Sequence, residues 1–148
     1  MLQVAFYCGR TRLFDRAVQW WTRGRYSHCE LVTGPAPDGA HWCISASMLD
    51  GGVRIKAITL HPDRWHLVPV PWCDCLQASR WLQAHAGQGY DFLGLLGFVW
   101  RPQAGRGRRW FCSEAVGAAL GLPDPWRFDP SALHAVVTMA QQMERRHG

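Results

Sequence analysis

The sequence predicts one α+β domain, in which helices pack on a small antiparallel sheet. Its 148 residues are close to the usual size of one domain, and 48% are hydrophobic, enough for a sizeable core. Short apolar runs separated by turn residues indicate strands in the first half, and longer amphipathic runs indicate helices on either side. No repeat or linker interrupts residues 1–148, so we expect a single domain.

Strands are expected where short apolar runs end at turn residues. The first run ends at Gly9, and Gly, Pro and Asp are dense over 34–39 and 50–52, which favours antiparallel hairpins. Pro69 points to the edge of the sheet, because proline cannot donate to a neighbouring strand. The expected strands are residues 2–8, 26–33, 40–47, 53–56 and 65–70.

Helices are expected where apolar residues recur with helical spacing. Asp74 is a good N-cap, and glycines follow several of the helical runs. The stretch 90–100 is almost all apolar and glycine, which favours a buried helix far too short to span a bilayer. A basic loop at 102–109 follows it. The expected helices are residues 11–23, 74–86, 90–100, 112–120 and 129–146.

Composition limits the partners and the compartment. The net charge of +5 comes almost entirely from scattered arginines, so we expect no nucleic acid but do expect compatibility with anionic polymers or membrane surfaces. No apolar run is long enough for an integral membrane protein. Met1–Tyr7 does not resemble a signal peptide, so we expect a cytoplasmic protein whose six cysteines are free thiols.

Cys112 is the first candidate functional residue. It follows the bulky pair Trp110-Phe111 and begins a helical run of small residues. The first turn of a helix has free N–H groups and a positive dipole end, and both favour a thiolate. A cysteine there suits a thiol nucleophile, although free cysteine is more often a small buried residue.

His28 is the candidate base, and the hairpin predicts its partners. On a strand it shares one face with Glu30, which we interpret as a possible electrostatic helper or, equally, as a surface or Arg-paired carboxylate. If the 34–39 loop is symmetric, paired residue numbers sum to 73, which sets Ser45 opposite His28. Ser45 would then orient the imidazole, and Ser47 would replace it only after a two-residue change of register.

These motifs resemble the permuted branch of the NlpC-type cysteine peptidases, the YiiX-like proteins of the papain-like superfamily. The likeness rests on Tyr26-Ser27-His28 and Phe111-Cys112-Ser113-Glu114, supported by the block at 90–98, and spans roughly residues 3–135. In that branch the histidine precedes the cysteine. The resemblance implies a permuted papain-like fold with Cys112 as nucleophile and His28 as general base. The family's third polar residue, often a Glu before Ala, is here Ser45 before Ala46.

The resemblance implies a thiol-dependent hydrolase that cleaves an amide, in cell-wall peptide or a related substrate, or an ester. The expected substrate is a peptide, an amide or a lipid-like molecule, with no cofactor, and the oxyanion would bind the Cys112 N–H. A phage particle or lysis is one route to the cell wall. The alternative is an inactive papain-like module that binds cell-wall peptide or a lipid headgroup, which the serine at position 45 favours.

Two rival sites also follow from the sequence. Cys8 precedes a helix and is a second candidate nucleophile, although the resemblance gives it no role. Cys73 and Cys75 with His61 or His66 form a possible set of metal ligands, but without the usual zinc spacing. We therefore expect no metal.

Overall fold

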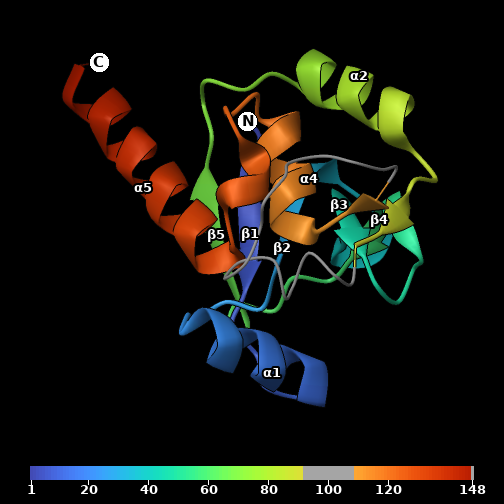
Figure 1. The fold of residues 1–148 in the computed structure, drawn as a ribbon. Helices are drawn as coiled ribbons and strands as arrows, with labels where there is room; N and C mark the ends of the chain where they lie inside the picture. Colours follow the sequence, from blue (N-terminus) through green and yellow to red (C-terminus); the bar gives the residue numbers. More distant parts are fainter. Residues whose placement is uncertain (92–108, 148) are drawn as a thin grey trace.

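The computed structural model describes residues 1–91 and 109–147, which form an α+β fold built on one sheet (Figure 1). The predicted fold class is confirmed at this level. The strands are β1 (Gln3–Tyr7), β2 (His28–Pro35), β3 (His41–Ser47), β4 (Gly52–Ile58), β5 (Trp65–Pro69), β6 (Gly89–Tyr90) and β7 (Arg109–Trp110). The helices are α1 (Leu13–Thr22), α2 (Cys75–His85), α4 (Cys112–Ala119) and α5 (Pro130–His147), with 3₁₀ turns at Pro37–Gly39 and Pro125–Arg127.

The strand order in the sheet is β5-β1-β2-β3-β4-β6-β7, and only the short pair β6–β7 is parallel. β5 lies at an edge, as Pro69 predicted. Tyr90 belongs to β6, so the predicted helix at 90–100 is wrong at its first residue, and the stretch from 92 lies outside the described residues. The predicted loop at 102–109 also lies outside them, except that Arg109 begins β7.

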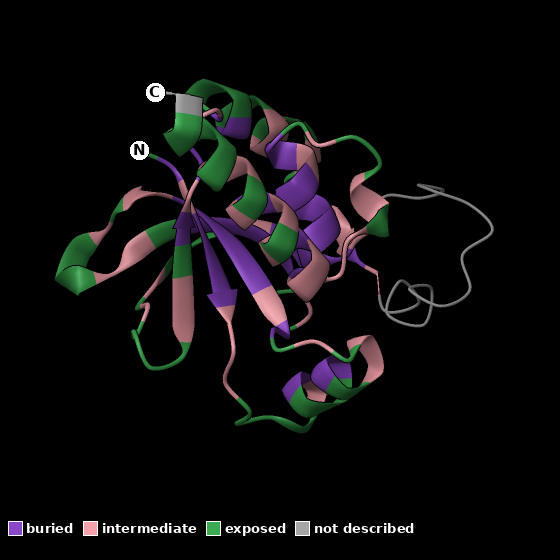
Figure 2. Ribbon diagram, turned by 90° about the vertical axis from the view of Figure 1, so that its left-hand side faces the viewer, coloured by how far each residue is buried: buried purple, intermediate pink, exposed green. Residues whose placement is uncertain are grey.

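Helices α2, α4 and α5 cover one face of the sheet, and α4 packs directly on β2 and β3 (Figure 1). Small side chains bring α4 close to its neighbours: a Cβ on Gly117 would lie 3.2 Å from the Pro125 side chain. Figure 2 shows α4 and the strands beneath it as the most buried part of the fold. Phe6, Leu31 and Leu133 join this core with no exposed surface.

The hairpin of β2 and β3 has a register different from the predicted one. Leu31 pairs with Ile44 and Val32 with Cys43, so paired numbers sum to 75 rather than 73. The expectation of a symmetric loop was wrong. The loop closes instead through the Ala36 N–H, which donates to the Ala40 carbonyl.

Two local features produce this register. A bulge follows Val32 in β2, and Asp38 in the 3₁₀ turn has a left-handed φ of 57°. Asp tolerates this conformation better than most residues. Continued along the strands, the register sets Ser47 opposite His28 and Ser45 opposite Glu30.

The approach of β6 to β4 depends on a glycine. Gly52 pairs with Gly89 and has a φ of 151°, and a Cβ built on it would overlap the backbone carbonyl of Gln88. The neighbouring Val53 N–H donates to that carbonyl at 2.8 Å, so the two backbones cannot simply separate. This contact holds β6, whose partner β7 leads into α4 and Cys112.

We predict that Gly52→Ala destabilises the fold by about 1–3 kcal/mol, the usual cost of overpacking, because the added methyl meets backbone. Gly34→Ala is the matched control, since a Cβ at Gly34 meets nothing within 4 Å. Urea unfolding of both variants measures the difference. Equal stability of the two would show that the approach of β6 is not constrained at Gly52.

Candidate functional site

Cys112 is the first residue of α4, as the sequence predicted, and it has no exposed surface. Phe111 precedes it in extended conformation, and the Phe111 N–H donates to the Glu114 carboxylate at 3.4 Å. The Ser113 hydroxyl donates to the Phe128 carbonyl. These contacts fix the first turn of α4, where helical N–H groups have no acceptor within the helix.

His28 is the first residue of β2, and its imidazole lies near enough to the Cys112 thiol for each group to shift the pKa of the other. The backbone and thiol of Cys29 also lie close enough to Cys112 to lower the pKa of its thiol. Because α4 packs on β2, the start of the helix meets the start of the strand. Residues 84 positions apart in the sequence are therefore side by side in the fold.

The environment of Cys112 favours its thiolate. Burial by itself would raise the pKa of the Cys112 thiol, because a charge is costly away from water. The hydrogen bonds from Cys29 and the positive charge of His28 outweigh burial and lower this pKa to about 5. A thiolate at neutral pH is the reactive form of a cysteine.

The pKa of His28 moves in the opposite direction. Burial would lower it, but the negative charges of Cys112 and Glu30 and their hydrogen bonds raise it to about 10. The thiolate's contribution to stability is lost as pH falls through about 5, because that folded-state pKa is lowered. The imidazolium's contribution is lost as pH rises through about 10, because that pKa is raised. Between these limits the two groups form an ion pair.

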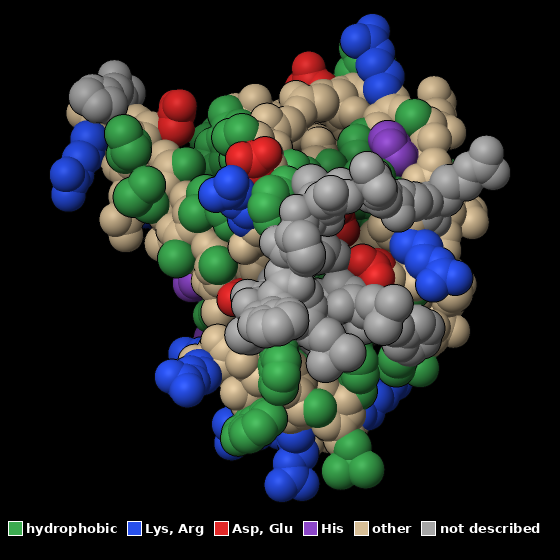
Figure 3. Space-filling view, viewed as in Figure 1, with side chains coloured by type: hydrophobic (Ala, Val, Ile, Leu, Met, Phe, Trp, Pro, Cys, Tyr) green, Lys and Arg blue, Asp and Glu red, His purple; other side chains and the backbone are tan. Residues whose placement is uncertain are grey.

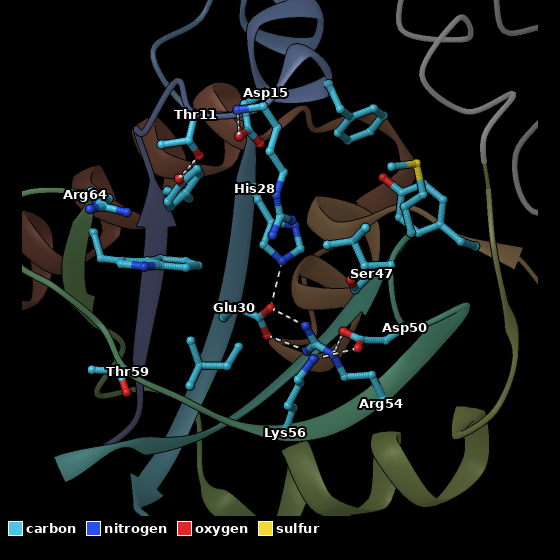
Figure 4. A pocket seen from close by; sticks show the side chains of 18 of the residues that line it. Thr11, Asp15, His28, Glu30, Ser47, Asp50, Arg54, Lys56, Thr59 and Arg64 are labelled. Carbon is cyan, nitrogen blue, oxygen red and sulfur yellow. Dashed lines mark hydrogen bonds and ion pairs between the residues drawn. The ribbon is translucent and has the colours of Figure 1, made fainter. Parts of the chain in front are cut away.

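Glu30 holds the far side of the His28 ring (Figure 4). Its Oε1 lies 2.7 Å from His28 Nε2, which leaves Nδ1 as the ring nitrogen available to Cys112. Glu30 has no exposed surface, and burial would raise the pKa of its carboxyl. The hydrogen bonds from Arg54 and His28 lower that pKa below its ordinary value, so Glu30 is an anion. The sequence allowed two interpretations of Glu30, an electrostatic helper of His28 or a surface or Arg-paired carboxylate. In the structure Glu30 is paired with Arg54 and also contacts His28.

Arg54 binds both oxygens of Glu30, from Nη2 to Oε1 at 2.6 Å and from Nη1 to Oε2 at 2.7 Å. Such a bidentate pair is the strongest arrangement for a guanidinium and a carboxylate. Arg54 Nε also donates to Asp50 at 2.9 Å, and Lys56 donates to the other Asp50 oxygen at 2.7 Å. Positive and negative groups thus alternate from Lys56 at the surface to the partly exposed His28 (Figure 4).

Ser45 does not orient His28. Its hydroxyl donates to the Cys29 carbonyl at 2.7 Å, and it stands across the sheet from Arg54. The two-residue change of register moved it away from His28. Between Glu30 and Arg54 a small side chain leaves room for the guanidinium, so Ser45 makes space for the ion pair.

The residues before His28 anchor the start of β2. The Tyr26 hydroxyl hydrogen-bonds with His66 Nδ1 at 2.8 Å and with His134 Nε2 at 3.3 Å. The Ser27 hydroxyl donates to Asp15 of α1 at 3.2 Å. The motif Tyr26-Ser27-His28 therefore ties one strand end to α1, β5 and α5.

A cavity of about 480 Å³ opens beside His28 and Glu30. Its walls include the aromatic rings of Tyr7, Phe14 and Trp65 and several cationic side chains. Cys112 is not among the lining residues. The cavity therefore reaches the imidazole side of the His28–Cys112 pair. The cationic lining residues are Arg12, Arg54, Lys56 and Arg64.

The rival sites are organised differently. Cys8 Sγ lies 3.9 Å from His66 Nε2 and donates to the Arg64 carbonyl at 3.3 Å, so it has an imidazole neighbour but no carboxylate in that contact. Over residues 1–91 and 109–147, no group of three His, Cys, Asp or Glu side chains could hold a metal ion. The possible set of Cys73, Cys75 and a histidine is therefore not assembled.

Sequence reasoning missed Arg54, Asp50 and Cys29 as parts of the site. Arg54 would follow from the correct register, which sets it across from Ser45 beside Glu30. Cys29 follows His28 in β2 and lies in the core with residues of α4. Cys112 lies near both His28 and Cys29 because α4 begins above the start of β2.

No family model, curated protein or solved structure matched the chain. Within the described part of the chain, no helix is both long and apolar enough to span a bilayer. The site is therefore interpreted from its own geometry.

We predict that Glu30→Ala destabilises the fold by about 3–5 kcal/mol, because it leaves the Arg54 charge without its bidentate partner. Lys56→Met is the control: it breaks the ion pair of a half-exposed side chain and should cost less than about 1 kcal/mol. Thermal and urea unfolding measure both. A Glu30→Ala variant as stable as Lys56→Met would contradict the role of Glu30 as the buried centre of the charge row.

Proposed function

We propose that the chain is a thiol-dependent hydrolase that cleaves an amide, in cell-wall peptide or a related substrate, or an ester. The observation that carries the proposal is the pair of the buried Cys112 and the partly exposed His28, with Glu30 on one ring nitrogen of His28. A nucleophile and an adjacent base are the centre of this chemistry, and a third group orients the base. The histidine precedes the cysteine, and on that order we further propose a permuted papain-like fold of NlpC type.

The reaction begins with the Cys112 thiolate. It attacks the substrate carbonyl carbon, and the carbonyl π pair moves to oxygen, which the Cys112 N–H stabilises at the start of α4. Protonated His28 gives its proton to the leaving amine or alcohol as that bond breaks, which leaves a thioester. Neutral His28 then takes a proton from water, the hydroxide attacks the thioester, and the acid and the thiolate are released.

Glu30 supports each proton transfer without taking part in it. Its hydrogen bond to Nε2 holds the ring with Nδ1 toward the thiol, and its charge stabilises the imidazolium. This is the role that the resemblance implied for Ser45. A carboxylate stabilises a cationic ring better than a hydroxyl does, so the site is better suited to catalysis than the sequence indicated.

The cavity beside His28 is the proposed substrate site. Tyr7, Phe14 and Trp65 offer apolar surface to a peptide or an acyl chain, whose carbonyl would be directed past His28 toward Cys112. The expected setting stays as the sequence indicated: synthesis in the cytoplasm, with a phage particle or lysis as a route to a cell-wall substrate.

A binding module is the second candidate function. It is favoured by the burial of Cys112, which has no exposed surface and does not line the cavity. In that case the cavity would hold cell-wall peptide or a lipid headgroup without turnover. Catalysis and simple binding differ in whether product is released.

We predict that Cys112→Ala lowers hydrolysis by at least about 10³-fold, because it removes the nucleophile. The substrates are an activated ester and peptidoglycan fragments, with product release measured by absorbance and mass spectrometry. Cys8→Ala is the matched control. It removes the other thiol that lies beside an imidazole, and it should leave the rate unchanged.

Loss of activity in Cys8→Ala but not in Cys112→Ala would move the site to the His66 pair. Binding of peptidoglycan fragments without product from the unaltered protein would establish the binding module instead. A thioester trapped on Cys112, seen as a mass increase that hydroxylamine removes, would identify the hydrolase directly.

A further inference from the structure

The outer face of α1 carries large apolar side chains in water. Leu13 is 82% exposed and Trp20 is 77% exposed, and these positions lie seven residues apart on one side of the helix. The opposite side packs inward through Val18 and Gln19, which are buried. Single exposed leucines are common on protein surfaces. An exposed Trp and an exposed Leu on the same side of one helix form a larger apolar surface, which indicates an interaction site.

Basic side chains surround this apolar row. Within residues 10–25 the one acidic residue is Asp15, which is buried and accepts hydrogen bonds from the Ser27 hydroxyl and the Arg12 N–H. Its charge therefore does not face the solvent beside the arginines. Figure 3 shows hydrophobic and basic side chains together at the lower end of the molecule, where Figure 1 places α1. The exposed basic residues of this segment are Arg10, Arg12, Arg16, Arg23 and Arg25.

We propose that α1 docks the protein on an anionic lipid surface, with Leu13 and Trp20 inserted at the level of the headgroups. Trp favours this depth because its ring is apolar and its N–H can remain hydrated. Arginines beside it meet the negative phosphates, which adds electrostatic attraction to the burial of apolar surface. The helix lies on the surface and does not cross it, since it has ten residues.

The charge of the α1 face selects lipid over a second copy of the chain. A two-fold dimer through this face would bring two sets of five arginines together. Repulsion between these positive charges opposes self-association, whereas the same charges attract lipid phosphates. Arg12 and Phe14 also line the cavity, so docking through α1 sets the cavity close to the lipid surface.

The test is co-sedimentation of the full chain with vesicles, and it does not depend on any enzymatic activity. Vesicles of phosphatidylcholine with phosphatidylglycerol should pellet the protein at low salt, and vesicles of phosphatidylcholine alone should not. High salt should release it, because salt screens the arginine–phosphate attraction. The variants Leu13→Ser with Trp20→Ser, and Arg16→Glu with Arg23→Glu, should each weaken binding by at least about tenfold.

The control variant is Met139→Ser with Met143→Ser, which removes two exposed apolar side chains of α5. α5 begins near α1, but its C-terminal half, which carries Met139 and Met143, extends away from α1 in Figure 1. This variant should therefore bind the vesicles like the unaltered protein. Circular dichroism verifies that every variant is folded. Failure of the unaltered protein to bind anionic vesicles, or equal loss in the α5 variant, would overturn the proposal. A dimer in solution that the Trp20 variant abolishes would assign the face to a second copy instead.

Discussion

The buried carboxylate of Glu30 is the constraint on which the rest of the site depends. An anion without exposed surface is stable only when charged partners replace water, and here Arg54 binds both of its oxygens while His28 binds one. Arg54 binds the Glu30 carboxylate from one side, and the negative charge of Glu30 also acts on the His28 imidazole on the other side. The same contact fixes which ring nitrogen faces Cys112. Removing the carboxylate would therefore affect both the ion pair that links β2 to β4 across β3 and the protonation of His28.

Charge alternation explains how a buried thiolate and a partly exposed imidazolium can exist side by side. Burial disfavours each charge alone, because it raises the pKa of Cys112 and lowers the pKa of His28. Together they are stabilised by their mutual attraction, by Glu30 on the imidazole side and by the Cys29 backbone on the thiolate side. The fold delivers these groups from separate elements: β2 carries the base, and α4 carries the thiol at its first turn. The short β6–β7 pair, held at Gly52, brings the chain to that turn.

The sequence predicted the elements better than their register. Apolar spacing and turn residues located β1, α1, α2 and α5, and the position of Cys112 at a helix start followed from the small residues after it. The bulge after Val32 was not predictable, because it depends on how β2 and β3 twist together and not on a residue type. The turn sets paired numbers that sum to 76 beside the loop, and the bulge changes the sum to 75. Together they place Ser45 opposite Glu30 and not opposite His28, so the contact of Arg54 with Glu30 was not predicted. Two-residue strands such as β6 carry no periodicity, so they too escaped sequence reasoning.

The charge state of Cys112 is the central claim, and its thiolate absorbance in the ultraviolet tests it most directly. The measurement is the difference spectrum between the unaltered protein and Cys112→Ala as pH is varied. Cys43 and Cys73 add little at neutral pH, since burial raises their pKa values to about 12 and about 11. The account predicts a thiolate band at pH 7 that disappears with a midpoint near 5 as the thiol takes up a proton. A band that appears only near the ordinary thiol pKa of 9.0 would contradict it.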